Sequence, residues 1–115
     1  MDAAENRQEI MEEIKRQYSE ERCTDLQQIL STMSNPTRFR ILCALRVAPF
    51  SVTELVSITE GNLSNVSQHL KMMWMSGYVS KVRKGKHVTY TLADERVRTA
   101  IEMFEDMYPL ESYVV

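Results

Sequence analysis

The sequence predicts a mainly α-helical domain with one small β-hairpin, and three observations carry this prediction. Apolar residues recur at three- and four-residue steps through most of the 115 residues, as they do on the buried faces of amphipathic helices. Residues 79–92 depart from this period, because β-branched residues alternate there on both sides of Lys84-Gly85-Lys86, as in a hairpin. A chain of this length forms one domain with a modest core. We therefore expect a single domain over residues 1–115.

The sequence of the first segment predicts an amphipathic helix that needs another surface to pack against. Residues 4–20 carry a narrow apolar stripe on an otherwise charged surface: Ile10, Met11, Ile14 and Tyr18. Such a helix is marginal when it stands alone in water. We therefore expect residues 1–22 to form a dimerisation helix.

Two further helices are expected before residue 50. One carries a second apolar stripe from Leu26 to Met33 and is broken by Ser34-Asn35-Pro36. Asn35 as the cap and Pro36 at the first helical position then start another helix, which runs through Arg46.

Residues 51–78 predict a helix-turn-helix. Ser51-Val52-Thr53-Glu54 matches a capping box at the start of a short helix. Gly61 lies in a tight connection, and Asn62 is a good cap for a longer helix over residues 62–78. A short helix, a glycine-containing turn and a longer helix make up this motif.

The helix over residues 62–78 has two unlike faces. Its apolar stripe is Val66, Leu70, Met73 and Gly77, whereas the rest of its first three turns is polar without any acid. Amide, hydroxyl and imidazole groups can donate to and accept from base edges in a DNA major groove, and none of them repels phosphate. An ordinary solvated polar face is the alternative that this helix alone leaves open.

The hairpin and the last helix complete the pattern. The hairpin tip carries Arg83, Lys84, Lys86 and His87, and a basic hairpin directly after the second helix of the motif is a wing. Asp94 caps a last helix over residues 94–108, whose apolar stripe is more than a two-stranded wing covers. We expect the first and last helices to pack against each other and against a second copy, through Ile10, Met11, Ile14, Tyr18, Val97, Ile101, Phe104 and Tyr108.

The charge distribution favours a DNA-binding centre. The net charge is only −2, but residues 1–22 carry seven acids against four bases, and residues 93–115 carry six acids against two bases. Residues 23–92 carry eight bases against three acids. A basic centre between acidic flanks suits a DNA-binding face if the terminal helices point elsewhere.

Several function classes are disfavoured. No apolar run approaches the roughly 18 residues of a membrane span, and the acidic start of the chain is unlike a signal peptide, so we expect a cytoplasmic protein. Two cysteines far apart do not make a disulfide scaffold. Paired carboxylates in a cleft and a glycine-rich phosphate loop are both missing from the sequence, and both histidines fall on the expected DNA face. We therefore expect no enzyme activity and no cofactor.

The motifs together resemble the ArsR/SmtB family of winged helix-turn-helix repressors. The resemblance covers roughly residues 26–108 and is carried by LSTMSNPTRFRILCAL (30–45), SVTEL (51–55), LSNVSQHLKMMWMSGYV (63–79) and VRKGKHVTYTL (82–92). It implies a homodimer that places two recognition helices in successive major grooves of an inverted-repeat operator in double-stranded DNA. It also implies a set of DNA-contacting residues: Arg38, Ser51, Ser64, Asn65, Ser67, Gln68, His69, Lys71, Arg83, Lys84, Lys86 and His87.

The resemblance is closest to the branch that senses thiols and persulfides and not metals. Asp94 matches the first ligand of a familiar metal site on the last helix, but Arg96 replaces a histidine and Met107 and Leu110 stand at the late positions. Residues 56–58, where other members carry Cys-x-Cys, contain no thiol. We therefore expect no metal.

Cys43 is the redox candidate. Its context FRILCAL resembles the thiol-sensing branch, although Pro109 stands where a second cysteine is expected, so Cys23 is the only possible partner in this chain. The alternative is that Cys43 is a small apolar filler on a core helix. A repressor without a thiol switch, and a winged-helix interaction module without specific DNA binding, therefore both remain open.

Overall fold

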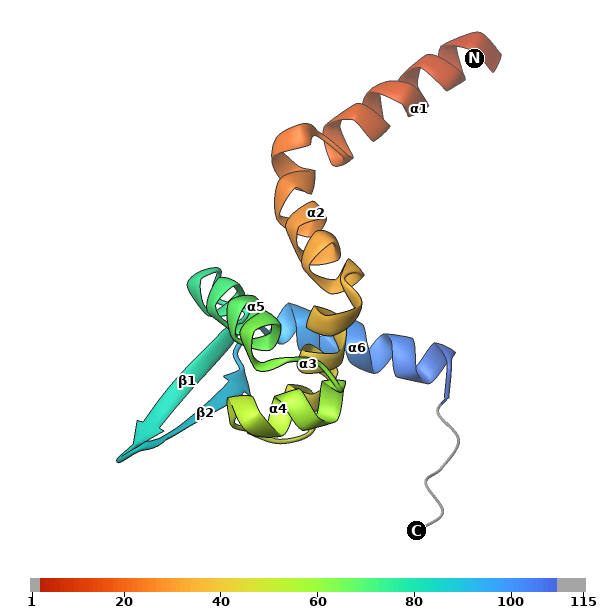
Figure 1. The fold of residues 1–115 in the computed structure, drawn as a ribbon. Coiled ribbons are helices and arrows are strands. Elements are labelled where there is room, and N and C mark those ends of the chain that lie inside the picture. Colours follow the sequence, from red (N-terminus) through yellow and green to blue (C-terminus); the bar gives the residue numbers. More distant parts are fainter. Residues whose placement is uncertain (1–2, 110–115) are drawn as a thin grey trace. The chain divides into compact units, whose positions relative to one another are not determined.

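The computed structural model describes residues 3–109, and over these residues it contains helices and a single two-stranded antiparallel sheet (Figure 1). The elements are α1 (Ala3–Gln17), α2 (Glu20–Ser34), α3 (Pro36–Val47), α4 (Val52–Thr59), α5 (Leu63–Met75), β1 (Val79–Lys84), β2 (His87–Leu92) and α6 (Glu95–Met107). None of the helices in this described range is both long and apolar enough to cross a membrane. Leu110, one of the positions considered for a metal site, lies outside the described residues.

The chain divides into two compact units between Ser31 and Thr32. The N-terminal unit holds α1 and most of α2, and α1 has no buried residue. The expected single helix over residues 4–20 is wrong in one respect, because it ends at Gln17 and a new helix starts at Glu20. The Ser19 hydroxyl accepts from the backbone N–H of Arg22 at 3.3 Å, which is how a serine caps a new helix.

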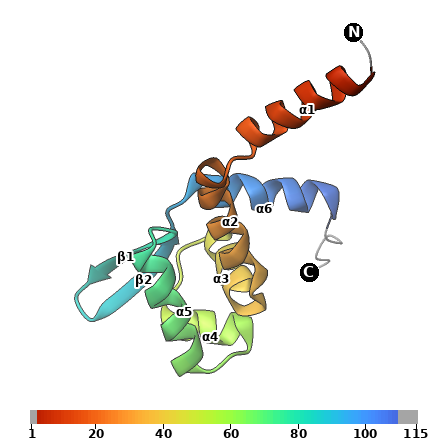
Figure 2. The ribbon, with the colours of Figure 1, turned by 90° about the horizontal axis from the view of Figure 1, so that it is seen from above.

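The main unit, residues 32–109 of the described chain, is built around apolar residues of α3, α4, α5, the hairpin and α6. The stripe Val66, Leu70 and Met73 of α5 is buried, as expected. The other large side chains with almost no exposed surface are Ile41, Leu42, Leu55, Val79, Val97 and Ile101. Figures 1 and 2 show α4 and α5 side by side, with the hairpin projecting beside them.

The helix-turn-helix begins with the capping box that the sequence predicts. The Ser51 hydroxyl accepts from the backbone N–H of Glu54 at 3.3 Å, and the Glu54 carboxylate accepts from the N–H of Ser51 at 3.0 Å. The turn is tight at Gly61, where an added Cβ would lie 3.2 Å from a methyl of Val66. The Asn62 side chain then accepts from the N–H of Asn65 at 2.8 Å and starts α5.

The end of α5 differs from the expectation. The helix stops at Met75, and Gly77 is not part of its apolar stripe but has a φ of +82°. The N–H of Tyr78 donates to the carbonyl of Met73 at 2.9 Å, and the N–H of Gly77 donates to the carbonyl of Trp74 at 3.1 Å. These two bonds form a Schellman motif, which requires the left-handed residue that glycine supplies.

The hairpin is confirmed, with a shorter connection than expected. Lys84 pairs with His87, so only Gly85 and Lys86 join the strands, and Gly85 has a φ of +63°. A backbone bridge between Phe50 and Tyr90 attaches the hairpin to the segment between α3 and α4. The base of the wing is therefore held against the helix-turn-helix.

Candidate nucleic-acid interface

The outer face of α5 presents the polar groups expected to read DNA. Ser64, Gln68 and Lys71 are exposed and recur at helical spacing on the side opposite the buried stripe, and Asn65 is exposed next to them. The capping bond at Asn62 uses only the backbone N–H of Asn65 and does not engage its side-chain amide. This face combines hydroxyl, amide and ammonium groups without a carboxylate.

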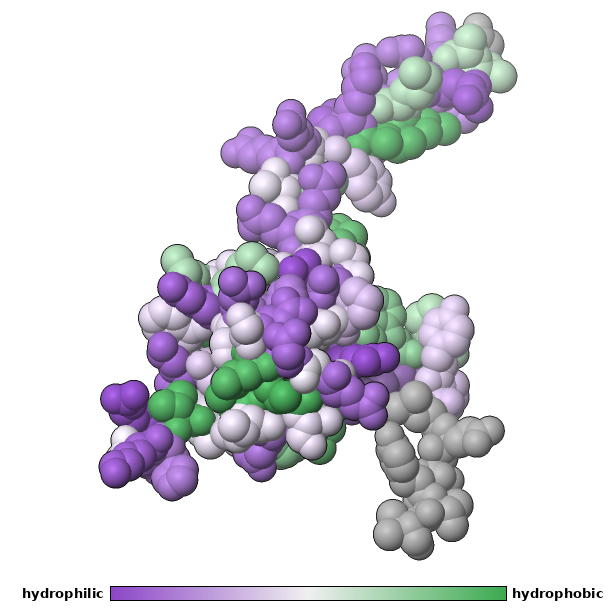
Figure 3. All heavy atoms as spheres, in the orientation of Figure 1, coloured by the Kyte–Doolittle hydropathy of each residue, from purple (hydrophilic) through white to green (hydrophobic). Residues whose placement is uncertain are grey.

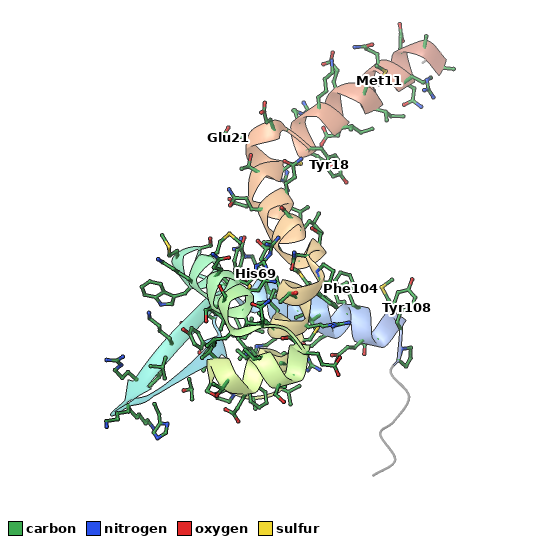
Figure 4. All side chains as sticks on the ribbon, in the orientation of Figure 1. Met11, Tyr18, Glu21, His69, Phe104 and Tyr108 are labelled. Atoms are coloured by element: carbon green, nitrogen blue, oxygen red, sulfur yellow. The ribbon has the colours of Figure 1, made fainter. Side chains whose placement is uncertain are left out.

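Two predicted contact residues lie on the flanks of α5 and not on its outer face. Ser67 and His69 are half-buried. Burial lowers the pKa of His69, and the positive charge of Arg38 on α3 lowers it further. The imidazole of His69 (Figure 4) is therefore neutral near pH 7 and can donate one hydrogen bond and accept another.

Arg38 is half-buried on α3, and its Nε donates to the carbonyl of Thr32 at 2.9 Å. This bond orients the guanidinium near the flank of α5 on which His69 lies. The first turn of α3 is itself fixed by Asn35, whose side chain accepts from the N–H of Arg38 at 3.0 Å.

Ser51 is committed to capping α4. Its hydroxyl accepts from the N–H of Glu54 and lies 3.1 Å from the hydroxyl of Thr53. The Glu54 carboxylate occupies the N–H of Ser51 at the same helix end. A phosphate at this position would therefore meet a negative charge, which weakens the expected contact from Ser51.

The hairpin tip is fully exposed and basic. Arg83, Lys84, Lys86 and His87 are all exposed, and Figure 3 shows hydrophilic residues covering this end of the hairpin. Within residues 3–109, no carboxylate forms an ion pair with these four side chains. Sequence reasoning missed a fifth cation of the wing: the Lys81 ammonium lies 4.0 Å from the centre of the Trp74 ring.

The residues assigned to a dimer interface fall into two groups. Ile10, Met11 and Ile14 of α1, Tyr18 just after it, and Phe104 and Tyr108 at the end of α6 are exposed. Figure 4 shows Phe104 and Tyr108 projecting from the end of α6. Val97 and Ile101 are only 0% and 1% exposed. These two side chains belong to the core of the protomer, in which α6 contacts α3. They have no free surface for a partner.

Cys43 lies on α3 beside an apolar cavity of about 300 Å³ that Phe39, Ile101, Phe104, Glu105 and Tyr108 also line. Burial raises the pKa of the Cys43 thiol, the Glu105 carboxylate raises it further, and Arg46 lowers it. One terminal nitrogen of the Arg46 guanidinium donates to both carboxylate oxygens of Glu105, at 2.6 Å and 2.5 Å. Cys23 is in the N-terminal unit, and both cysteines are free thiols.

The described residues contain no group of three or more histidine, cysteine and acidic side chains that could hold a metal ion. Asp94, which matches the first ligand of a metal site in the family, makes structural contacts within its own helix. Its carboxylate caps α6 and pairs with Arg96 at 2.8 Å. The side-chain hydrogen bond from Arg96 is the main reason why the pKa of Asp94 is lowered.

Comparison with known proteins identifies the fold and the family. The sequence pattern described as "Bacterial regulatory protein, arsR family" matches residues 35–81. The "Transcriptional activator HlyU" of Vibrio cholerae serotype O1 is 36% identical over 80 residues, which cover 70% of this chain and 74% of that protein.

Solved structures agree. Reduced HlyU from Vibrio cholerae superposes with a TM-score of 0.75 at 33% identity, covering 82% of this chain and 99% of that one. The transcriptional repressor BigR from Xylella fastidiosa has a TM-score of 0.75 at 26% identity, covering 84% of this chain and 98% of that one. A homodimeric winged helix-turn-helix domain from Mycobacterium bovis shares the fold, with a TM-score of 0.58 at 24% identity over 81% of this chain and 96% of that one.

The matched family and relatives are regulators of transcription and not enzymes. The family match over residues 35–81 covers α3, α4 and α5 and ends within β1. The chain belongs to the arsR family of bacterial regulatory proteins and is a winged helix-turn-helix, DNA-binding regulator of transcription.

Proposed function

We propose that this protein is a homodimeric, sequence-specific transcriptional repressor that inserts α5 into the major groove of an inverted-repeat operator. The observation that carries the proposal is the acid-free outer face of α5, where Ser64, Asn65, Gln68 and Lys71 are exposed together. Gln68 and Asn65 each have an amide that can pair bidentately with adenine. A bound dimer represses by covering the promoter.

Phosphate contacts position the protein on the duplex. Lys71 on the outer face of α5 and Arg38 on α3 supply two cations for such contacts. Lys84, Lys86 and His87 at the hairpin tip follow the backbone or the neighbouring minor groove. Such contacts raise affinity for all sequences and carry no base preference of their own.

The dimer accounts for exposed apolar residues on both terminal helices. Ile10 and Ile14 on α1, Tyr18 just after it, and Phe104 and Tyr108 at the end of α6 are between 41% and 74% exposed. A second copy that covers them removes this apolar surface from water. A twofold dimer places two copies of α5 in major grooves about 34–36 Å apart. The operator is then an imperfect inverted repeat.

The first test selects bound fragments from the genome of origin and compares two variants on the recovered operator. Gln68→Ala should lose most of the preference for the operator over unrelated DNA, because each good bidentate base pair contributes about 1–3 kcal/mol of discrimination. Lys86→Ala should weaken binding to both DNAs by the same factor. Gln27→Ala and Lys15→Ala, which change exposed residues of the N-terminal unit, are the matched controls.

The same titrations distinguish the proposed repressor from the alternative, an interaction module without specific DNA binding. Phosphate neutralisation makes affinity fall steeply as salt rises. A wild-type protein without operator preference and without salt-dependent binding would support the alternative and overturn the proposal. Normal operator binding by both Gln68→Ala and Lys86→Ala would show that the groove assignment is wrong.

For Cys43, the surroundings favour a repressor without a thiol switch. The thiolate is the reactive form, and burial together with Glu105 raises the pKa of this thiol and keeps it protonated. We expect operator binding in mobility-shift assays to be the same under dithiothreitol, diamide and polysulfide. Release of the DNA by an oxidant in the wild type, but not in Cys43→Ser, would establish the switch instead.

A further inference from the structure

Two cavities adjoin in the main unit, away from the reading face of α5. One is the apolar cavity of about 300 Å³ beside Cys43, and the other has a volume of about 560 Å³ and reaches Ile58 of α4. Phe39, Cys43 and Glu105 line both, so the two cavities share a boundary. Cavities of this size with mostly apolar walls and a few polar groups are typical of sites for small organic molecules.

The two cavities differ in their chemistry. The smaller one is also lined by Ile101, Phe104 and Tyr108, so its walls are mainly aromatic and aliphatic. The larger one carries two guanidinium groups, from Arg40 and Arg46 of α3. A molecule that occupies both cavities therefore needs an apolar body and a polar head.

The charges in the larger cavity favour an anionic head. Glu105 is the one acid among its lining residues, and both of its carboxylate oxygens accept from a single terminal nitrogen of Arg46. Arg40 is exposed and forms no ion pair within residues 3–109. The Nε of Arg46 is buried and has no acceptor in the described part of the chain, which is an unfavourable state for a donor. The arginines therefore retain donors that a carboxylate can use.

We propose that the joined cavities bind a small aromatic carboxylate as an effector. The ring occupies the apolar cavity, and the carboxylate lies at the two arginines of α3. Binding is noncovalent, because Cys43 contributes only a wall and forms no bond to the ligand. None of the lining residues belongs to the reading face or the hairpin tip, so the site goes beyond the proposed function.

Occupation of this site should weaken operator binding, a step that rests on the proposed function. Phe104 and Tyr108 also belong to the proposed dimer contact. A ligand packed against them changes the surface that meets the second copy, and with it the spacing of the two α5 helices. The entrance lies elsewhere, at the exposed residues Arg40, Val47 and Ile58. We expect operator affinity to fall at least about 5-fold, the lower end of typical coupling between sites.

The first test is calorimetric titration of the full-length protein with cinnamate and three matched compounds. Cinnamyl alcohol keeps the ring without the charge, cinnamylamine reverses the charge, and acetate keeps the head without the ring. Cinnamate should bind roughly 10-fold more tightly than each of them, because hydrogen bonds between charged groups are the strong ones. Absence of cinnamate binding, or tighter binding of cinnamyl alcohol or cinnamylamine, would overturn the inference.

Arg40 and Cys43 locate the bound molecule. Arg40→Ala should weaken cinnamate binding roughly 10-fold and leave cinnamyl alcohol unaffected, whereas Arg40→Lys should keep most of the affinity. Lys15→Ala removes an exposed cation from the N-terminal unit and should change neither. In a Cys23→Ser variant, cinnamate should slow alkylation of Cys43 by iodoacetamide, with half of the effect at its dissociation constant. Unprotected Cys43 at saturating cinnamate would place the ligand elsewhere and refute the site.

Mobility shifts with the recovered operator test the effector role. Saturating cinnamate should weaken the wild-type complex, and the same concentration should have much less effect on Arg40→Ala. By reciprocity, cinnamate should bind the operator complex more weakly than the free protein by the same factor. Unchanged operator affinity at saturating cinnamate would overturn the effector role. A wild-type protein that binds cinnamate at Cys43 but binds no DNA would instead overturn the proposed function and support the site.

Discussion

Replacing Asp94 should destabilise the start of α6. Its carboxylate contributes in two ways, as a hydrogen-bond acceptor that caps the helix and as a negative charge. One oxygen accepts from the N–H of Arg96 at 2.8 Å and from the N–H of Val97 at 3.3 Å, and the side chain is only 10% exposed. Loss of such a cap costs about 1 kcal/mol and up to 2. The negative charge at the helix N-terminus contributes about 0.3–1 kcal/mol more.

Asp94→Ala removes both parts, so we expect a loss of about 2 kcal/mol in the free energy of unfolding. Asp94→Asn keeps the accepting oxygen and loses only the charge, for which we expect about 0.5 kcal/mol. The ion pair with Arg96 is part of this charge contribution and stays small, because the Arg96 side chain is 62% exposed and solvent screens it.

The pH dependence tests the same assignment. The hydrogen bond from the Arg96 side chain, with help from two backbone N–H groups, holds the pKa of Asp94 below its ordinary value. Because the pKa is lowered by folding, the stabilisation is complete above the unfolded-state pKa and is lost as pH falls through the folded-state pKa. The difference between wild type and Asp94→Asn should therefore be constant near neutral pH and shrink in acid.

Urea unfolding followed by circular dichroism, at one fixed protomer concentration because a dimer's stability depends on it, measures these differences. Asp106→Ala, which removes an exposed acid near the other end of α6, is the control and should change stability by less than about 0.5 kcal/mol. Equal losses for Asp94→Ala and Asp94→Asn, or a difference that persists in acid, would refute the reasoning.

Three further changes test the fold around the interface. Leu70→Ala empties a site on α5 that is 0% exposed and should cost about 2–5 kcal/mol by urea unfolding. Glu105→Gln breaks the ion pair with Arg46 and should cost about 1 kcal/mol of unfolding free energy. In a variant that lacks Cys23, the same change should also speed alkylation of Cys43 by iodoacetamide, because the Glu105 carboxylate raises the pKa of the Cys43 thiol. Gly61→Ala places a Cβ 3.2 Å from the nearest side-chain carbon and should cost about 1–3 kcal/mol and lower operator affinity, since the neighbours must shift.

Helix starts were the most predictable feature of this fold. Asn35, Ser51, Asn62 and Asp94 were each assigned as caps from the sequence, and each side chain accepts from a backbone N–H two or three residues later. A cap depends on residues within one turn, so the local sequence contains all the information needed. Ser19 caps α2 in the same way. Its role was not predicted, because the apolar stripe continues past it and indicated one helix over residues 4–20.

The direction of an apolar face was harder to predict than its existence. Val97, Ile101, Phe104 and Tyr108 form one helical stripe in the sequence, and all four were assigned to a partner copy. The structure divides this stripe, because the first two lie in the protomer core and the last two are exposed. Periodicity shows that a face is buried and not which surface buries it, so only the tertiary structure separates the two halves.

The wing shows the same limit for charged residues. The sequence identifies a run of cations, but the strand register decides which of them act together. Lys81 and Arg83 share one face of the hairpin with their partners Tyr90 and Val88, whereas Lys84, at the next position, projects to the opposite side. A shift of the pairing by one residue would exchange these faces and move Lys81 away from Trp74. The set of cations that this wing presents on one face therefore depends on its register, which the bridge between Phe50 and Tyr90 ties to the helix-turn-helix.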